Sequence, residues 1–377
     1  MKKLLIFAKT LDGGTGTYLN TLLKIRDITN KDFIIAVAAL EKPVYMQQSG
    51  DEFHFMKKRN YSLDKYSFSY KHLTDFIKEF FWFKKIILKE KPDIILAVDV
   101  NCNIHTGLHK FLCRNNFKTI FTTHSDLDGN LDQKSSKFLR IILKQIINFF
   151  YNRADINICV SNDLSNSLVS NFGIKSKPIT IFNGLELPGS HKEIFEPGHN
   201  RILSVARLDK QKDHLTLLKA FELVTEKIKN AHLLLVGDGP LKNELENFVA
   251  KSNLDKNVEF VGWQNNINQF FLNSDIFVLS SNREGFPYAL IEAMSFGLPV
   301  VCTDTPYGPG EILDGGKYGY LVPMRDHIKM KEAILELLEN EEIYKKYSQL
   351  AFERSRLYTS ERMVNEYAVV IKELVKF

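Results

Sequence analysis

The chain has 377 residues, of which 44% are apolar and 25% charged, and it contains 20 Gly, 11 Pro and 4 Cys. At roughly 150 residues per domain this length predicts two to three domains, and the composition excludes collagen-like, low-complexity and disordered proteins. The cysteines form no C-x-x-C pair, which argues against a disulfide scaffold, a zinc ribbon or a thioredoxin-type redox site.

Short apolar runs rich in Ile, Val and Phe alternate with helical patterns along the whole chain. This alternation predicts an α/β fold with doubly wound parallel sheets. The twelve expected strands are residues 3–9, 32–40, 93–100, 118–124, 156–161, 178–183, 201–207, 232–239, 257–263, 275–281, 298–304 and 318–323. Twelve strands are too many for one sheet of this kind, so we expect two sheets.

The domain boundary is expected near the middle of the chain. Residues 184–200 have no apolar periodicity but contain two Pro and three Gly, which is typical of a linker. We predict a first domain over residues 1–190 and a second over residues 198–358. The remainder, residues 359–377, contains a favourable capping residue near its start, Ser360, and is expected to form a helix that returns to the first domain.

The glycine-rich turn after the first expected strand is a candidate phosphate site. Gly13, Gly14 and Gly16 would let the backbone approach a phosphate at the opening of a helix expected to start near Thr17. The spacing matches neither G-x-G-x-x-G nor a P-loop, and a turn without a ligand explains it as well. His124 ends another strand and would face a ligand there, although a lone histidine is more often structural.

Two cations follow the seventh expected strand. Arg207 and Lys212 stand directly before a helix for which Asp213 is the expected N-cap. They favour a diphosphate ligand, because the helix dipole, a guanidinium and an ammonium would all attract the same negative charge. Ordinary solvated surface charges are the alternative.

Two carboxylates, Glu284 and Glu292, follow the tenth expected strand and are separated by seven residues. In a continuous helix they would lie about 12 Å apart, beyond the roughly 5 to 9.5 Å of a hydrolytic carboxylate pair. We therefore expect them to bind hydroxyls on separate parts of one ligand, with the amides of Gly285 and Phe286 beside the first. Residues 308–310 form a second candidate cradle for an anion or a hydroxyl.

The second half of the chain resembles the retaining nucleotide-sugar glycosyltransferases of family 4. The matching motifs cover about 130 residues in family order, and they are ARLDKQKD, LLLVGDGPLKNEL, VEFVGW, SDIFVLSSNREGFPYALIEAMSFGLPVVCTD, GPGEIL and GYLVP. The Glu-seven-residues-Glu signature is specific, whereas the first half matches only through GGTGTY and TTHS. The resemblance implies the GT-B architecture, in which two Rossmann-like domains face each other across a cleft. It also implies that the first domain binds the acceptor and the second the nucleotide sugar.

The resemblance also implies a role for each candidate residue. The catalytic residues would be His124, Glu284, Arg207 and Lys212, and the substrate-binding residues Gly13, Gly14, Gly16, Gly262, Trp263, Gly285, Phe286, Pro287 and Glu292. Arg207 and Lys212 would hold the donor diphosphate, and Glu292 the ribose hydroxyls. Glu284 and the backbone of residues 285–287 would hold the donor sugar, which His124 would also reach.

The remaining substrate-binding residues would contact the nucleotide. Gly262 and Trp263 would lie beside the base, and Gly14 would close over the phosphates from the first domain. No D-x-D carboxylate pair stands near the expected phosphate site. We therefore expect no metal and no cofactor, only a nucleoside-diphosphate sugar as the donor substrate.

The expected activity is retaining transfer of a hexose or N-acetylhexosamine, preferably from a UDP sugar, with a GDP sugar left open. The acceptor would be a lipid-linked or cell-surface polysaccharide or lipopolysaccharide glycan. Three alternatives stay open: a nucleotide-sugar epimerase, a phosphorylase-like enzyme with pyridoxal phosphate, and a non-catalytic sugar-binding protein of the same architecture. We expect no nucleic-acid partner.

Charge and two amphipathic stretches raise the question of membrane binding. Residues 1–198 carry 28 Lys and Arg against 20 Asp and Glu, while the rest carries 22 against 25, within a net charge of +5. Residues 76–91 and 133–153 mix aromatic, aliphatic and basic side chains at helical spacing, as interfacial helices do. Core-facing helices explain the same pattern. We expect a cytoplasmic protein, with peripheral binding to the inner membrane as the favoured interpretation.

Overall fold

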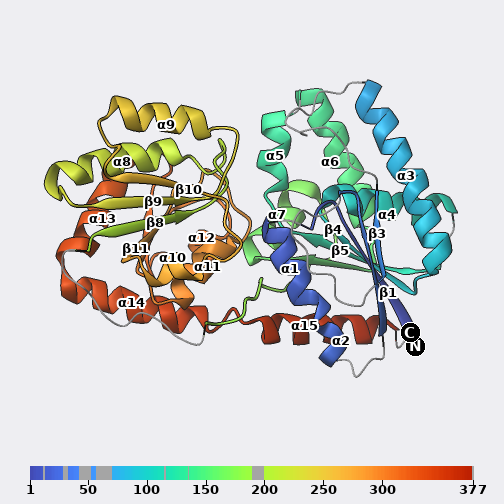
Figure 1. Ribbon diagram of the computed structural model, residues 1–377. Coiled ribbons are helices and arrows are strands. Elements are labelled where there is room, and N and C mark those ends of the chain that lie inside the picture. Colours follow the sequence, from blue (N-terminus) through green and yellow to red (C-terminus); the bar gives the residue numbers. More distant parts are fainter. Residues whose placement is uncertain are drawn as a thin grey trace. The chain divides into compact units, whose positions relative to one another are not determined.

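The computed structural model describes residues 1–11, 13–28, 33–41, 52–56, 70–113, 116–134, 136–188 and 199–375. The chain divides into two compact units, one made of Met1–Gly184 with Ser360–Phe377 and the other of Leu185–Thr359. Each unit holds one parallel sheet (Figure 1). Most of the expected linker, residues 189–198, lies outside the described residues.

The first unit is built on a seven-stranded parallel sheet with the order β3-β2-β1-β4-β5-β6-β7. Its strands are β1 (Lys2–Ala8), β2 (Phe33–Ala39), β3 (Glu52–Phe55), β4 (Ile94–Val98), β5 (Lys118–Thr123), β6 (Ile156–Cys159) and β7 (Ile179–Thr180). Residues 4–8 and 94–98 are fully or almost fully buried, because helices cover both faces of the sheet.

The helices of the first unit form two layers. One layer contains α1 (Gly13–Leu23), α2 (Ile25–Ile28) and α15 (Ser360–Val375), which pack against one another. The other contains α3 (Tyr70–Glu90), α4 (Val100–Cys113), α5 (Leu127–Lys134), α6 (Lys137–Tyr151) and α7 (Asn162–Phe172). The layers lie on opposite faces because right-handed crossovers run in opposite directions from β1 to β2 and from β4 to β5.

The second unit repeats this plan with the strand order β10-β9-β8-β11-β12-β13. Its strands are β8 (Arg201–Val205), β9 (His232–Val236), β10 (Val258–Gly262), β11 (Ile276–Leu279), β12 (Val300–Thr303) and β13 (Tyr320–Val322). Its helices are α8 (His214–Lys227), α9 (Lys242–Lys251), α10 (Asn268–Leu272), α11 (Tyr288–Ser295), α12 (Pro309–Ile312), α13 (His327–Glu339) and α14 (Glu341–Ser355). Buried side chains of α8, α9 and α13 form one core layer with the sheet.

Each of the twelve apolar runs contains a strand. Strand β3 was not predicted, because its sequence EFHF is short and half polar. Helix α1 begins at Gly13, not near Thr17, so the glycines lie inside its first turn. Among these, Gly16 is required for packing, because a Cβ there would lie 2.2 Å from the carbonyl oxygen of Leu11.

The strand order reverses at one place in each sheet, between β1 and β4 in the first and between β8 and β11 in the second. The loops after these strands diverge there, and doubly wound folds bind ligands in the resulting crevice. Across the described residues, no helix combines the length and apolar character needed to cross a membrane.

Candidate active site

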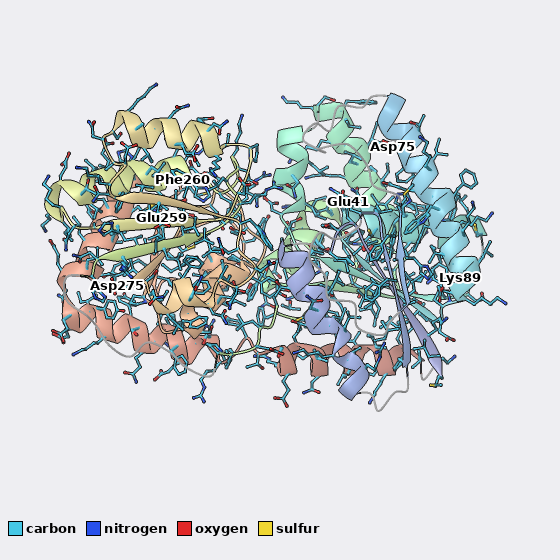
Figure 2. All side chains as sticks on the ribbon, viewed as in Figure 1. Glu41, Asp75, Lys89, Glu259, Phe260 and Asp275 are labelled. Atoms are coloured by element: carbon cyan, nitrogen blue, oxygen red, sulfur yellow. The ribbon has the colours of Figure 1, made fainter. Side chains whose placement is uncertain are left out.

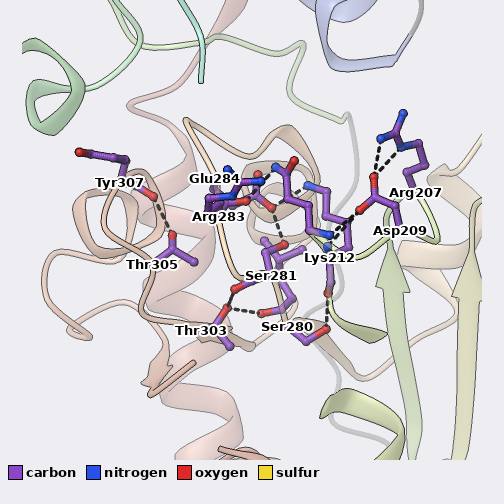
Figure 3. Close-up of polar contacts among 12 residues, drawn as sticks. Arg207, Asp209, Lys212, Ser280, Ser281, Arg283, Glu284, Thr303, Thr305 and Tyr307 are labelled. Atoms are coloured by element: carbon purple, nitrogen blue, oxygen red, sulfur yellow. Dashed lines mark hydrogen bonds and ion pairs between the residues drawn. The ribbon is translucent and has the colours of Figure 1, made fainter. Parts of the chain in front are cut away.

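The loop after β8 is organised by a residue that the sequence analysis missed, Asp209. Its Oδ1 accepts hydrogen bonds from the backbone N–H groups of Gln211 at 2.9 Å and Lys212 at 3.2 Å. Its Oδ2 accepts one from Nε of Arg207 at 2.6 Å (Figure 3). An aspartate that bonds backbone groups two and three residues ahead is typical of a turn, and this signal was present in ARLDKQKD. Asp209 therefore fixes the backbone that presents both cations.

Lys212 and Glu284 form a close ion pair between the loops after β8 and β11. Lys212 Nζ lies 2.6 Å from Glu284 Oε1, and Ser281 Oγ donates to the same oxygen at 2.5 Å. Glu284 is only 7% exposed, and the Lys212 side chain is 21% exposed. Because this cation is largely buried and paired, the solvated-surface interpretation is wrong for Lys212. The Arg207 side chain, at 69% exposure, keeps much of its guanidinium open to solvent.

Further contacts join the two loops into one rigid edge (Figure 3). The backbone N–H of Asn282 donates to the carbonyl of Gln211 at 2.7 Å, and Gln211 Nε2 donates to the carbonyl of Arg283 at 2.9 Å. Thr303 Oγ1 donates to the carbonyl of Ser281 at 2.5 Å from the end of β12. The position of Lys212 relative to Glu284 is therefore set by backbone contacts as well as by their charges.

The segment from Glu284 to Glu292 is not one continuous helix, so the distance argued from helical rise does not apply to these two carboxylates. Helix α11 begins at Tyr288, and Pro287 precedes it with φ −71° and ψ 114°. Proline disfavours helical geometry in the residue before it, which keeps Phe286 outside the helix. Glu292 lies within α11, and burial raises its pKa to about 7.

The loop after β12 packs directly on the residues beside Glu284. Gly308 has φ +85°, and a Cβ there would lie 2.8 Å from the carbonyl oxygen of Gly285 and 3.0 Å from Cδ of Pro287. Phe286 is buried and stacks edge-on against Tyr358 at 5.3 Å. Residues 285–287 are thus held on both sides, and Gly308 is needed for this close approach.

Gly262 and Trp263 lie at the carboxyl end of β10, on the same edge of the second sheet as the loop after β8 that carries Arg207. Gly237 donates its N–H to the carbonyl of Gly262 at 2.9 Å, and a Cβ on Gly237 would lie 2.1 Å from the carbonyl oxygen of Ala206. The ends of β8, β9 and β10 therefore meet next to Arg207. Trp263 is 46% exposed, so part of its indole ring faces solvent there.

His124 belongs to a separate group in the first unit. Its ring lies edge-on to Tyr18 of α1, 4.4 Å between centroids, and its Nε2 lies 2.8 Å from Thr122 Oγ1. Thr122 Oγ1 also lies 3.1 Å from the carbonyl oxygen of Ala97. In the tautomer with the proton on Nε2, His124 donates to Thr122, Thr122 donates to Ala97, and Nδ1 is left as an acceptor. Burial lowers the pKa of His124 to about 4, which makes the ring neutral at pH 7.

The predicted residues thus form two groups, one in each unit. Arg207, Lys212, Glu284 and Glu292 come from the second unit with residues 262–263 and 285–287, whereas His124 and the glycines of α1 come from the first. Gly13 and Gly14 are exposed in the first turn of α1, while Gly16 is buried. Within the described part of the chain, no three His, Cys, Asp or Glu side chains cluster as metal ligands would.

Two family models match the chain. The model for glycosyl transferases group 1 matches residues 190–354, and that for glycosyltransferase family 4 matches residues 44–187. An uncharacterized glycosyltransferase of Methanocaldococcus jannaschii is 30% identical over 334 residues, which is 76% of this chain and 81% of that protein. The chain belongs to the glycosyl transferases group 1 family. It is therefore a glycosyltransferase, as predicted.

Two further comparisons concern fold and relatives of this glycosyltransferase. A Campylobacter jejuni protein is 29% identical over 235 residues, 61% of this chain and 64% of that protein. Its name is N-acetylgalactosamine-N,N'-diacetylbacillosaminyl-diphospho-undecaprenol 4-alpha-N-acetylgalactosaminyltransferase. The crystal structure of Anabaena HepE in complex with UDP matches with a TM-score of 0.77 at 16% identity, covering 99% of this chain and 100% of that one. The latter likeness confirms the predicted α/β fold class of GT-B glycosyltransferases.

Proposed function

We propose that this glycosyltransferase moves a hexose or N-acetylhexosamine from a UDP sugar to a lipid-linked or cell-surface glycan, with retention of anomeric configuration. The observation that carries the proposal is the Lys212–Glu284 pair beside Arg207 at the switch point of the second sheet. The HepE complex with UDP supports the donor. The Campylobacter relative, whose name includes diphospho-undecaprenol, supports a lipid-linked acceptor.

Cleavage of the donor develops positive charge at the anomeric carbon and negative charge on the leaving diphosphate. Arg207 and Lys212 would stabilise the leaving group, because preorganised cations act without solvent reorganisation. Glu284 holds the Lys212 ammonium in place now and would also accept hydrogen bonds from sugar hydroxyls. We propose that the acceptor oxygen bonds to the anomeric carbon on the face that the phosphate leaves. The acceptor proton then passes to a phosphate oxygen.

The other site residues would bind the rest of the donor. Glu292 would accept hydrogen bonds from the ribose hydroxyls, and Trp263 with Gly262 would lie beside the base. Neutral His124 would accept a hydrogen bond from a hydroxyl of the transferred sugar through Nδ1. Gly13 and Gly14 would offer first-turn amides of α1 to the phosphates, since these N–H groups have no partner within their own helix.

An anionic membrane would be the second partner, bound through an apolar–basic surface on α3, α4 and α6. We define this surface by its exposed apolar residues Ile77, Phe81, Leu88, Phe111, Leu112, Phe138, Ile141 and Ile142 and by the lysines Lys78, Lys84, Lys85, Lys89 and Lys137. Phe138 alone is 74% exposed. Figure 2 shows Asp75 and Lys89 near the beginning and the end of α3.

The core-facing alternative explains only one side of these helices. Phe83, Ile86 and Ile87 of α3 are buried, while the apolar–basic surface is exposed on the same helix. Exposed large apolar side chains between lysines are typical of a helix in a membrane interface. Arg140 and Lys144, which the sequence pattern also favoured, instead pair with Asp128 at 3.0 and 2.7 Å. The membrane contact is therefore proposed without them.

A donor screen followed by product analysis tests the proposed function. UDP and GDP sugars are compared by thermal shift, because a ligand of the native state raises the melting temperature. The best donor is then incubated with glycan acceptors, and the anomeric configuration of the product is read by NMR. An α-linked product from an α-linked donor supports retention. Conversion of the donor without an acceptor would indicate an epimerase, and binding without turnover a sugar-binding protein.

A further inference from the structure

Arg354, near the end of α14, donates hydrogen bonds to two backbone carbonyls of α12. Its Nε donates to the carbonyl of Ile312 at 2.9 Å, and its Nη2 donates to the carbonyl of Glu311 at 2.9 Å. The last carbonyls of a helix have no partner in the regular helical pattern, and a cation beside them also opposes the negative end of the helix dipole. A guanidinium can reach both because its N–H groups form a planar fork. Arg354 therefore caps the carboxyl end of α12.

Two tyrosine rings lie against the same guanidinium. Cζ of Arg354 is 4.9 Å from the ring centroid of Tyr318 and 5.7 Å from that of Tyr358, and both distances are within the roughly 6 Å of a cation–π contact. Tyr358 is buried, and its ring also packs edge-on against Phe286, with 5.3 Å between centroids. Arg354 thus contacts α12 directly and reaches residues 285–287 through one aromatic ring.

The turn before α12 connects this helix to the loop after β11. Gly308 forms that turn, and its lack of a Cβ allows the close contact with residues 285–287. The backbone N–H of Ile312 donates to the carbonyl of Gly308 at 2.9 Å, and Thr305 Oγ1 donates to the carbonyl of Tyr307 at 2.8 Å (Figure 3). Because α12 has only four residues, tertiary contacts rather than its own hydrogen bonds hold it in place. Arg354 supplies two of these contacts.

Resting on the proposed function, in which residues 285–287 hold the donor sugar, we propose that Arg354 is a positioning residue for that sugar. It acts through α12 and the Gly308 turn on one side and through Tyr358 on the other. All of these residues belong to one unit. Loss of the guanidinium leaves two carbonyls without this donor and lets the two loops shift against each other. A displacement of about 1 Å in a positioning contact can lower a rate by about 10².

Arg354 should affect the sugar and not the nucleotide. The proposed diphosphate contacts, Arg207 and Lys212, follow β8, and Trp263 follows β10. Glu292 lies on α11, which packs along α14. None of these four residues is bonded to Arg354 or to α12 in the contacts that fix the Gly308 turn. The affinity for UDP therefore serves as an internal measure of whether a variant is folded.

Calorimetry on the full chain tests the inference with two probes, UDP and the UDP sugar that gives the largest thermal shift. Arg354→Met keeps a side chain of similar length but donates no hydrogen bond. It should bind UDP within roughly twofold of the unchanged protein and the UDP sugar about tenfold more weakly. The matched control is Arg356→Met, which removes an exposed cation from the same segment, and it should leave both affinities unchanged.

Gly308→Ala interrupts the same path at its other end, because a Cβ there would lie 2.8 Å from the carbonyl oxygen of Gly285. This variant should also bind the UDP sugar more weakly than the unchanged protein and keep its affinity for UDP. Substitutions that act on one shared contact are not additive. The double variant with Arg354→Met should therefore lose less affinity than the product of the two single losses.

Hydrogen exchange on the same proteins follows the path without any ligand. The amides of residues 310–313 should exchange faster in Arg354→Met than in Arg356→Met, because one end of α12 has been released. The inference is overturned when Arg354→Met binds the UDP sugar as tightly as Arg356→Met, when it loses affinity for UDP and for the UDP sugar equally, or when the single losses multiply. Failure of the proposed function shows differently: the unchanged protein then binds no UDP sugar, while exchange at residues 310–313 still depends on Arg354.

Discussion

Lys212 and Glu284 are 72 positions apart in the chain, yet Nζ of the lysine lies 2.6 Å from Oε1 of the glutamate. The strand order reverses between the two strands that precede them. The two opposite charges form a largely buried ion pair. The pair therefore holds the Lys212 ammonium in position at the edge of the sheet where a donor diphosphate is proposed to bind.

The Lys212→Gln variant should lose turnover by about 10² to 10³, the typical cost of removing one preorganised donor from a charge that develops in the transition state. Lys210→Gln is the control, because Lys210 is an exposed residue of the same loop. Steady-state kinetics with the donor found by the screen measure the turnover of both variants. Equal turnover in the two variants would refute a role for Lys212 on the leaving group.

Replacing Glu292 should weaken nucleotide binding and remove its pH dependence. The pKa of Glu292 is raised to about 7 by burial, so the carboxyl becomes ionised as pH rises from 6 to 8. An ionised carboxylate is the stronger hydrogen-bond acceptor, and UDP affinity should therefore increase over this range. Calorimetry should show that increase in the unchanged protein and a flat, weaker profile in Glu292→Gln. An unchanged affinity in Glu292→Ala would contradict the ribose contact.

Turnover should survive excess EDTA. Two cations, Arg207 and Lys212, are proposed to supply the charge that a divalent ion supplies in metal-dependent enzymes. Initial rates with and without the chelator check this. A rate that falls with EDTA and returns with Mn²⁺ or Mg²⁺ would show that the cations are insufficient.

The apolar–basic surface should bind vesicles that contain acidic lipid, and neutral vesicles should bind poorly. Replacing Lys84, Lys85 and Lys137 with Gln should weaken binding by about 1 kcal/mol per removed charge. Added salt should weaken it too, because screening acts over about 8 Å at physiological ionic strength. Cosedimentation measures both effects, with turnover of a water-soluble acceptor unchanged. A wild-type chain that stays in solution with acidic vesicles at low salt would rule the surface out.

The protein should lose stability as pH falls from about 6.5 to 4. Burial lowers the pKa of His109, His124 and His214 to about 4, so the unfolded chain binds protons in this window that the folded chain does not. For His214, which is 2% exposed, the shift corresponds to roughly 3 kcal/mol. Denaturant unfolding at pH 7 and pH 4.5 should show a smaller loss in His214→Gln than in the exposed control His232→Gln. Equal losses of unfolding free energy in the two variants would contradict a contribution of His214 to the pH dependence.

Local sequence patterns determined much of this fold. The apolar runs located twelve strands, because a strand buried in a parallel sheet needs consecutive apolar side chains. The Glu284 and Glu292 motif pointed to the family, which the comparisons confirm. The short strand β3 escaped because its four residues carry no such pattern, and the start of α1 was misplaced because glycine disfavours helices while the close packing of Gly16 on Leu11 requires it.

Only the tertiary structure decided which charged residues act together. Apolar periodicity reports burial one element at a time, whereas the partner of Lys212 depends on the order in which strands join the sheet. Tertiary packing also places Arg354 against α12, although Arg354 was not singled out in the sequence. The folded chain also distinguishes basic residues that look alike in the sequence. Lys84 and Lys85 are exposed, whereas Arg140 and Lys144 form ion pairs with Asp128. The sequence specifies the type of each side chain, but which side chains interact depends on distances that only the folded chain establishes.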